Sequence, residues 1–430
     1  MISNQEESMK LVLKNVGKVQ NAAVEINGIT VIAGENDTGK STVGKALFSV
    51  FNSFYNIDRK IMSERANSID NQLFAVSKDF RSGWFFLTDY SELTKEIISL
   101  VKQKKSEEEL RKKISDIISE YNKKKSNTLS QDAIDGCAER IARSLLIPDE
   151  EILKTVLQKN MDAEFRGQIG NVFYEAESLI RLVIQNENVE VKFLNNKIAD
   201  LRNPIRLGTE TIYMDDPFVL DELTGSESRN WTRMQNYLDH RAHLEKCLTS
   251  VSDKHNVVDE IVANKKLEQI YQTISTVCEG DVVDEKHDSV GYHIGNQRLE
   301  VRNMSTGLKT FAILKRLLTN GCIEMNGTII LDEPEIHLHP EWQLVFAELI
   351  VLLHKEFGLH ILLNTHSPYF LNAIEVYAAK YQVTDKCKYY LMQSTGKTSE
   401  IEDVSDNIEK IYRKLARPLQ ELENQRYRYE

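Results

Sequence analysis

The fold of this 430-residue chain is decided by the stretch Gly34-Glu35-Asn36-Asp37-Thr38-Gly39-Lys40-Ser41. It has the spacing G-x-x-x-x-G-K-[ST], in which backbone N–H groups and a lysine surround the phosphates of a nucleotide. A β-branched run, Gly28–Ala33, precedes the loop, and an apolar segment with helical spacing, Thr42–Phe51, follows it. Because the loop thus lies between a strand and a helix, the sequence predicts a site for ATP and Mg²⁺.

The residue types of the loop each have a physical task at the phosphates. Gly34 and Gly39 allow the backbone to curl, so that N–H groups and the positive end of the helix dipole converge on the β-phosphate. Lys40 reaches the β- and γ-phosphates, and the Ser41 hydroxyl is a ligand of Mg²⁺. We therefore expect Gly34 to Thr42 to bind the nucleotide. The alternative is an ordinary glycine turn before a helix, against which the complete motif and its flanks argue.

An acidic pair, Asp332-Glu333, directly follows an apolar strand expected at Thr328–Leu331. In phosphoryl transfer an acid at the tip of such a strand holds Mg²⁺, and Asp332 has that place. Glu333 is then positioned to polarise the attacking water as general base. A lone Asp-Glu pair is more often a solvated strand end, so this interpretation depends on the phosphate loop.

Two further segments narrow the class of protein. Ser305-Thr306-Gly307-Leu308-Lys309 opens an apolar helix, and its serine hydroxyl and backbone N–H groups could face a phosphate. An ordinary N-cap by Ser305 or Thr306 explains the same residues. His366 ends an apolar strand, where a histidine can contact the γ-phosphate and orient water. A loop histidine at a strand end is the alternative.

In this order the four segments resemble the head of an ABC-type ATPase of the SMC, RecF and Rad50 branch, and more narrowly the OLD-like ATPases. Two strings are characteristic of that branch: Glu333-Pro334-Glu335-Ile336-His337-Leu338-His339-Pro340 and Thr365-His366-Ser367-Pro368. The resemblance implies an α/β fold with an N-terminal antiparallel β meander, a P-loop mixed sheet and a large helical insertion between the Walker A and Walker B motifs. It also implies that Lys40, Glu333 and His366 are catalytic.

Signature segments of this class act in trans, so the resemblance implies head-to-tail dimers, or multimers of dimers, with two ATP molecules at the interface. Ser305, Gly307 and Lys309 would then bind the nucleotide held by the Lys40 of the opposing chain. The usual leucine-serine-glycine-glycine form is not kept, because Met304 and Thr306 stand at its first and third positions. We identify no glutamine for the usual Q-loop.

The pair His337 and His339 has a spacing that a metal site could use. It also lies directly after the Walker B motif, where the resemblance implies a dimer contact. We favour the dimer contact, since no cysteine is near the pair in sequence.

The order of elements predicts five segments. From Asp58 to Phe173 there is one proline, and charged residues recur at helical spacing. Their apolar stripes are short and irregular, which indicates a compact helical domain and not a long coiled coil. The segments are 1–55, the first part of the head; 56–177, the helical insertion; 178–300, a return segment with strands and helices; 301–395, the second part of the head; and 396–430, a C-terminal helical tail.

The composition limits the kinds of core, binding surface and cellular compartment that the chain can have. A 41% hydrophobic content supports a sizeable core, and a net charge of −11 argues against non-specific DNA binding over the whole surface. The five cysteines are scattered without a C-x-x-C pair, which fits a reducing compartment. No apolar run is long enough to cross a membrane, and the start, Met1–Glu7, is polar and acidic. We expect a cytoplasmic protein with no membrane contact.

The motifs are shared by ATPases of defence systems, DNA repair and membrane transport. Relatives that are nucleases carry a Toprim domain after the head, but the residues after His366 offer no glutamate with an Asp-x-Asp cluster, so we expect an ATPase that is not itself a nuclease. The chain then most resembles the PtuA family of Septu anti-phage defence, a scaffold for a separate HNH nuclease that would also bring the nucleic acid. The alternative is a RecF-like DNA-binding repair ATPase. The large insertion and the string Glu333–Pro340 argue against a transporter ATPase.

Overall fold

The computed structural model describes residues 9–78, 91–102, 106–124, 129–223, 237–250, 267–285 and 290–429. Within them the chain divides into two units, Met1–Tyr55 with Leu157–Glu430, and Asn56–Val156. The second unit begins where the predicted insertion 56–177 begins but ends earlier. The reason is that the later part of α6 (Asp149–Phe165) hydrogen-bonds within the first unit, with Asn160 donating to Ser53 Oγ at 3.0 Å.

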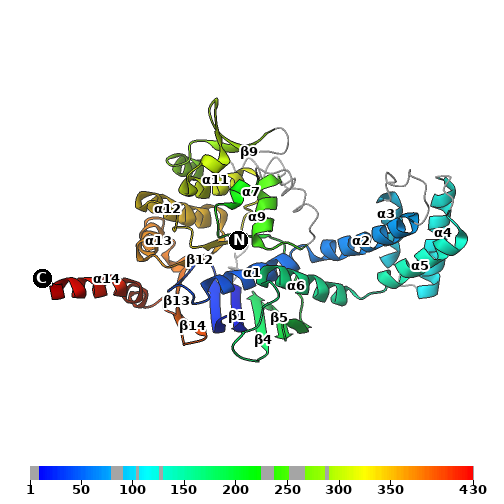
Figure 1. Ribbon diagram of the computed structural model, residues 1–430, viewed down its shortest axis with the longest axis horizontal. Helices are drawn as coiled ribbons and strands as arrows, with labels where there is room; N and C mark the ends of the chain where they lie inside the picture. Colours follow the sequence, from blue (N-terminus) through cyan, green and yellow to red (C-terminus); the bar gives the residue numbers. More distant parts are fainter. Residues whose placement is uncertain are drawn as a thin grey trace, which may run out of the picture. The chain divides into compact units, whose positions relative to one another are not determined.

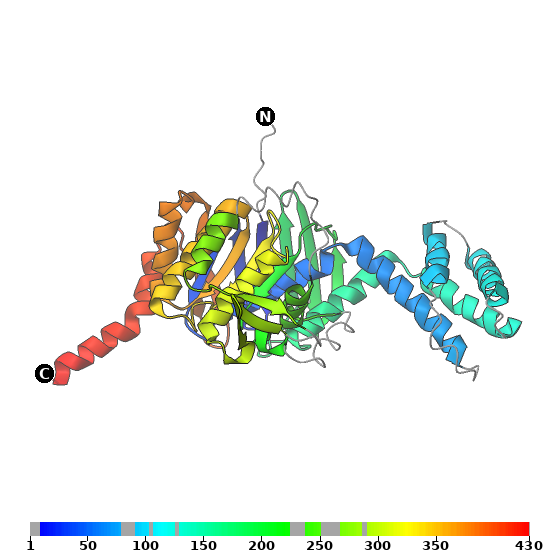
Figure 2. The same cartoon turned by 90° about the horizontal axis from the view of Figure 1, so that it is seen from above.

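The first unit is built on one large sheet (Figures 1 and 2). Its strand order is β6-β5-β4-β1-β2-β14-β13-β3-β12-β11-β7. The strands are β1 (Met9–Val16), β2 (Val19–Ile26), β3 (Ile29–Gly34), β4 (Ser178–Ile184), β5 (Glu187–Leu194), β6 (Lys197–Arg202), β7 (Thr211–Met214), β11 (Thr328–Asp332), β12 (His360–Thr365), β13 (Cys387–Ser394) and β14 (Ser399–Asp403).

The two ends of the sheet differ in strand direction. From β6 to β2 neighbouring strands are antiparallel, and their burial alternates, as expected of a sheet with one face toward water. From β13 to β7 neighbouring strands are parallel. Strands β3, β11 and β7 are buried at every position, as parallel strands covered on both faces must be.

Helices cover both faces of the parallel part. Side chains such as Val31, Leu331 and Leu363 share one core with α11 (Thr306–Thr319), α12 (Pro340–Phe357) and α13 (Pro368–Lys380). The helix after the phosphate loop, α1 (Lys40–Phe54), lies on the other face. There Gly44 approaches the sheet so closely that a Cβ would be 3.1 Å from both Ile330 Cγ2 and the Tyr213 hydroxyl. This contact fixes the phosphate loop against the Walker B strand.

Smaller elements complete the first unit. A three-stranded sheet has the order β10-β9-β8. The strands of this sheet are β8 (Asp281–Asp284), β9 (Val290–Ile294) and β10 (Gln297–Glu300). The remaining elements of the unit are α7 (Val219–Glu222), α9 (His240–Thr249), a helix over 267–275, the 3₁₀ turns Val301–Asn303 and Thr384–Lys386, and α14 (Glu409–Tyr429).

The second unit is a helical bundle with its own core. It contains α2 (Ile57–Lys78), α3 (Ser91–Ser99), the 3₁₀ turn Leu100–Lys102, α4 (Glu107–Lys124) and α5 (Gln131–Leu145). Ser106 and Glu109 form a capping box, each side chain accepting from the other residue's backbone N–H. The buried Arg65 donates to the carbonyls of Leu145 and Ile147, which ties α2 to the end of α5.

The predicted fold class is confirmed as a mixed α/β fold with one large P-loop sheet, and a helical unit interrupts the chain between the two Walker motifs. At the N-terminus the antiparallel pairing joins β1 and β2, whereas β14 and β13 lie between β2 and β3. Two further details differ. The segment 396–430 is not wholly helical, since Ser399–Asp403 forms β14, and β6 was not expected in 178–300. The predicted return segment 178–300 lies partly outside the described residues. In the described part, no helix combines the length and apolarity needed to cross a membrane.

Candidate functional site

The site lies where four parallel strands end. Strand β3 leads into the phosphate loop, β11 into Asp332 and Glu333, β12 into His366, and β7 into Asp215. Because the carboxyl ends of parallel strands meet at one edge of a sheet, segments far apart in sequence meet there. The sequence prediction that the Walker motifs and His366 belong together agrees with this placement.

The phosphate loop has the backbone that its glycines permit. Gly39 has φ 91° and precedes α1, and a Cβ on Gly34 would lie 2.6 Å from the Met392 carbonyl oxygen. Lys40 is 4% exposed, and its Nζ donates to the carbonyls of Gly34 at 3.1 Å and Glu35 at 3.0 Å. The ammonium is thus held inside the loop, where its three donors can be shared with phosphate oxygens.

Glu333 lies between Lys40 and His366. Its Oε1 is 3.2 Å from Lys40 Nζ and 3.4 Å from His366 Nδ1. The hydrogen bond with His366, and the charge of Lys40, lower the pKa of Glu333, while the same contact with Glu333 raises the pKa of His366. Glu333 is therefore a carboxylate at neutral pH, the form that a general base requires.

The backbone of Glu333 is strained. Its φ is 50°, a conformation that non-glycine residues rarely adopt and that costs about 1–3 kcal/mol. The Glu333 N–H donates to the Asn364 carbonyl at 2.9 Å, which fastens this turn to the neighbouring strand β12. Strain of this kind persists where the surrounding structure determines it, and here it sets the direction of the Glu333 carboxylate.

Both carboxylate oxygens of Asp332 are held by side chains. Tyr213 donates its hydroxyl to Oδ2 at 2.7 Å, and Asn364 donates Nδ2 to Oδ1 at 2.9 Å. The Tyr213 hydroxyl is also 3.5 Å from the Ser41 carbonyl oxygen, so the tyrosine joins Asp332 to the start of α1. A carboxylate oriented in this way beside the exposed Ser41 has the oxygen donors that Mg²⁺ prefers.

Sequence reasoning missed Tyr213 and Asn364. Asn364 could have been noticed because it is an amide within an apolar strand. The strand register places Asn364 directly opposite Asp332. The signal for Tyr213 was weaker, since an aromatic residue in a buried strand is ordinary.

Replacing Tyr213 by phenylalanine is expected to raise the Mg²⁺ concentration for half-maximal ATPase activity about 10-fold, the usual effect of losing a residue that orients a metal ligand. The ring keeps its packing, so the thermal stability should change little. Titrating Mg²⁺ at saturating ATP measures the effect. Tyr390→Phe is the matched control, because its buried hydroxyl accepts from the Glu25 N–H and not from the residues that hold Asp332. An unchanged Mg²⁺ requirement in Tyr213→Phe would contradict the assignment.

Glu335 anchors the segment that carries His366. It is buried, and its Oε1 accepts from the Thr365 hydroxyl and, at 3.4 Å, from the His366 N–H. Burial raises the pKa of Glu335. This contact holds the strand end that presents His366 to Glu333.

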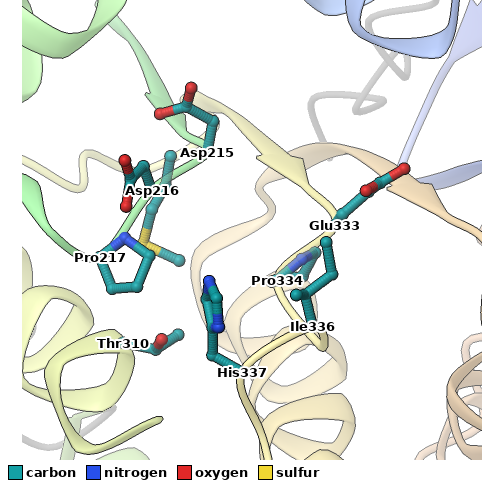
Figure 3. A pocket seen from close by; sticks show the side chains of 9 residues that line it. Asp215, Asp216, Pro217, Thr310, Glu333, Pro334, Ile336 and His337 are labelled. Atoms are coloured by element: carbon teal, nitrogen blue, oxygen red, sulfur yellow. The ribbon is translucent and has the colours of Figure 1, made fainter. Parts of the chain in front are cut away.

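A small pocket of about 30 Å³ opens beside these residues (Figure 3). Asp215 and Asp216, from the end of β7, lie on one side, and Glu333 with Pro334 lies on the other. Asp216 Oδ1 accepts from the Phe218 N–H at 2.9 Å, which is the turn expected at this strand end.

A largely buried network of ion pairs contacts the end of β7 through Asp215. His240 lies between two carboxylates: Nδ1 is 2.7 Å from Glu164 Oε1, and Nε2 is 3.0 Å from Asp215 Oδ2. Its ring stacks on Tyr213 with centroids 4.3 Å apart. Burial alone would lower the pKa of His240, but its hydrogen bonds to Asp215 and Glu164 outweigh burial and raise the pKa to about 9. The network connects α6 and α9 to the tyrosine that holds Asp332.

Replacing His240 by alanine is expected to destabilise the first unit by about 3–5 kcal/mol, because Glu164 is left buried without its cation. The wild-type pKa lies above the ordinary value of 6.5, so the stabilisation is complete below about pH 6.5 and is lost as the pH rises through about 9. Unfolding temperatures between pH 6 and 10 test this. The gap between wild type and His240→Ala should narrow as pH rises, and a constant gap would contradict the protonated histidine.

The signature residues are arranged differently from the Walker residues. Ser305 is exposed and caps α11, accepting from the Leu308 N–H at 3.4 Å. Gly307 is packed so closely that a Cβ would lie 2.9 Å from the His337 carbonyl oxygen. Lys309 is buried, and its Nζ pairs with Asp221 at 2.6 Å. Lys309 is thus directed into the protein, although the sequence groups it with the nucleotide-binding residues.

In the described part of the chain, no hydrogen bond or ion pair joins Ser305, Gly307 or Lys309 to the phosphate loop of the same chain. Two acidic residues of the loop have other partners. Asp37 pairs with Lys18 at 2.5 Å, and Glu35 pairs with Lys414 of α14 at 3.2 Å. The C-terminal helix therefore contacts the phosphate loop, which the sequence did not indicate.

Comparison with known proteins identifies the class. A family model described as the AAA ATPase domain matches residues 9–371. Among solved structures, an SMC head bound to the C-winged helix domain of ScpA is 14% identical, covers 92% of this chain and 96% of its own, and has a TM-score of 0.41. An SMC head domain from Thermotoga maritima is 12% identical over 92% and 98% of the chains, with a TM-score of 0.38.

An ATP-binding cassette of an ABC transporter, in its ADP conformation, is 10% identical, covers 96% of each chain and has a TM-score of 0.35. The match to the family model is the stronger finding, since it spans the phosphate loop, both acids and His366.

Proposed function

We propose, from the premise that this chain belongs to the AAA ATPase domain family, that it binds and hydrolyses ATP with Mg²⁺. The observation that carries this proposal is the position of Glu333 Oε1 within 3.4 Å of both Lys40 Nζ and His366 Nδ1. A carboxylate in that place can accept a proton from water beside the phosphates that Lys40 binds.

The residues divide the work as follows. Lys40 binds the β- and γ-phosphates, and in doing so its ammonium turns from Glu333 toward phosphate oxygens. Glu333 accepts the proton of the attacking water, and His366, at the end of β12, orients that water. Ser41 and Asp332 would hold Mg²⁺, which would supply charge stabilisation at the phosphates. Tyr213 and Asn364 keep the Asp332 carboxylate in place.

We further propose that the site is completed by a second copy of the chain in a head-to-tail dimer. Support comes from the exposed Ser305 at the N-terminus of α11, whose hydroxyl and free backbone N–H groups can bind an anion. Within the described residues, these groups make no contact with the phosphate loop of their own chain. The γ-phosphate of ATP held by the other chain is the anion that this arrangement would bind.

We propose a regulatory role for this ATPase in anti-phage defence, controlling a separate HNH nuclease. The proposal rests on the resemblance of the motif strings to the PtuA family. The helical unit Asn56–Val156 adds a surface that a partner could bind. In this scheme the ATP state changes the dimer interface, and that change is passed to the nuclease.

Co-expression with neighbouring genes, followed by pull-down and mass measurement of the complex, tests this role. A stoichiometric complex with a small HNH protein supports it. The alternative, a RecF-like DNA-repair ATPase, predicts turnover stimulated strongly by duplex DNA without a protein partner. That result would contradict the defence role while leaving the ATPase assignment intact.

A further inference from the structure

A second group of metal-ligating side chains lies outside the nucleotide site. Glu210, His243 and Cys247 offer one carboxylate oxygen, one imidazole nitrogen and one sulfur, all within 4.8 Å of one another. Among residues 9–429 outside the undescribed gaps, no other group of three histidine, cysteine or acidic residues meets that distance. None of the three has a role in the ATPase mechanism.

Separate parts of the fold bring these residues together. His243 and Cys247 are four residues apart on α9 and so share one face of the helix. Glu210 immediately precedes β7, the edge strand of the sheet. Cys322 follows α11, and its sulfur lies 3.2 Å from the Cys247 carbonyl oxygen. The neighbouring Cys322 thiol and burial raise the pKa of the Cys247 thiol.

The distances are close to those of a tetrahedral site. His243 Nε2 is 2.8 Å from Glu210 Oε1 and 4.0 Å from Cys247 Sγ. Metal–ligand bonds of about 2.0–2.3 Å separate tetrahedral ligands by roughly 3.3–3.8 Å. Side-chain adjustments of under about 1 Å therefore suffice, without any movement of the backbone.

The surroundings hold the ligands in place. His243 and Cys247 are buried, and the ring of Phe48, on the helix that follows the phosphate loop, packs edge-on against His243 with centroids 5.4 Å apart. Asn320 donates to the Cys247 carbonyl oxygen at 3.0 Å, which fixes the end of α9 against the end of α11. Such packing and hydrogen bonds are what orient ligands in metal sites.

We propose that Glu210, His243 and Cys247 bind a thiophilic divalent metal ion of which Zn²⁺ is the representative. A thiolate, an imidazole and a carboxylate select zinc over Mg²⁺, which takes oxygen ligands. Three protein ligands leave one tetrahedral position open. The ion joins α9 to the residue that precedes β7, the edge strand that contains Tyr213. Binding releases the thiol proton of Cys247 to solvent.

Metal content of the full-length protein, purified under reducing conditions without a histidine tag, tests the proposal. After incubation with ZnCl₂ and gel filtration, about one Zn²⁺ per chain is expected. Replacing Zn²⁺ by Co²⁺ should give the visible bands of a tetrahedral site and a thiolate charge-transfer band. His243→Gln and Cys247→Ser should each lose at least about 10-fold in affinity, whereas Cys137→Ser, a buried cysteine of the other unit, should retain the metal.

The remaining outcomes each decide the matter. Wild-type protein that retains no zinc overturns the proposal, as does zinc retained equally by wild type, His243→Gln and Cys247→Ser. A Cys247–Cys322 disulfide in the non-reduced protein, with no metal in the reduced protein, also overturns it. His243→Gln and Cys247→Ser could lose the metal simply by misfolding. Glu210→Gln is the variant that separates the two effects, since this partly exposed residue can be changed with the core intact. It should weaken Co²⁺ binding and keep the thiolate band. The readout is metal, so failure of the ATPase assignment would not affect it.

Discussion

Replacing Glu333 by glutamine is expected to reduce ATP turnover by about 100- to 10,000-fold, the contribution of a positioned general base, while ATP binding persists. The amide keeps the size of the side chain and its place between Lys40 and His366 but cannot accept the proton of the attacking water. Phosphate release at saturating ATP measures turnover, and calorimetric titration measures binding.

The matched control for this change is Glu341→Gln. Glu341 is exposed in the first turn of α12 and lies on the same segment of the head. It should leave turnover within about 2-fold of wild type, as surface substitutions usually do. Normal turnover by Glu333→Gln would show that Glu333 is not the base, and loss of ATP binding would show that the residue holds the nucleotide instead.

Replacing Lys40 by alanine is expected to weaken ATP binding by more than about 100-fold, and with it to remove turnover. The Lys40 ammonium is buried within the loop, where a charge-assisted bond to phosphate is not screened by water. The change also leaves the Glu333 carboxylate without its cation, which adds repulsion toward the phosphates. Calorimetric titration with a slowly hydrolysed ATP analogue measures the loss.

Lys45→Ala serves as the control for Lys40→Ala. Lys45 lies on the same helix, is partly exposed, and is outside the phosphate loop. It should bind ATP as wild type does. Circular dichroism should show the same helix content in both variants. Near-wild-type affinity in a folded Lys40→Ala protein would mean that the loop is not the phosphate site.

The sequence was sufficient for the parts of the site that depend on local motifs. The phosphate loop, the acids after β11 and the histidine after β12 each follow a strand that could be identified from its apolar residues. Parallel pairing then places their ends together, as observed. The strand before the loop, expected at Gly28–Ala33, forms as β3, because its β-branched apolar residues mark it.

The sequence was insufficient where a residue's role depends on tertiary contacts. Lys309 is a lysine beside a signature-like turn, yet Asp221 draws it into the protein. Tyr213 and Asn364 look like core residues until the strand register puts them against Asp332. Strand β14 is short and polar, and it is a strand only because β13 and β2 flank it. No local propensity reports such pairings.

In the proposed dimer, ATP joins two heads through Ser305 of one chain and the phosphate loop of the other. Light scattering measures the mass of the Glu333→Gln protein with and without ATP and Mg²⁺. We expect ATP to double the mass from the apo value, one chain being 49.5 kDa, and we expect Ser305→Arg in the same protein to prevent the increase. A mass that ATP leaves unchanged, or an increase that Ser305→Arg does not affect, would contradict the proposed dimer.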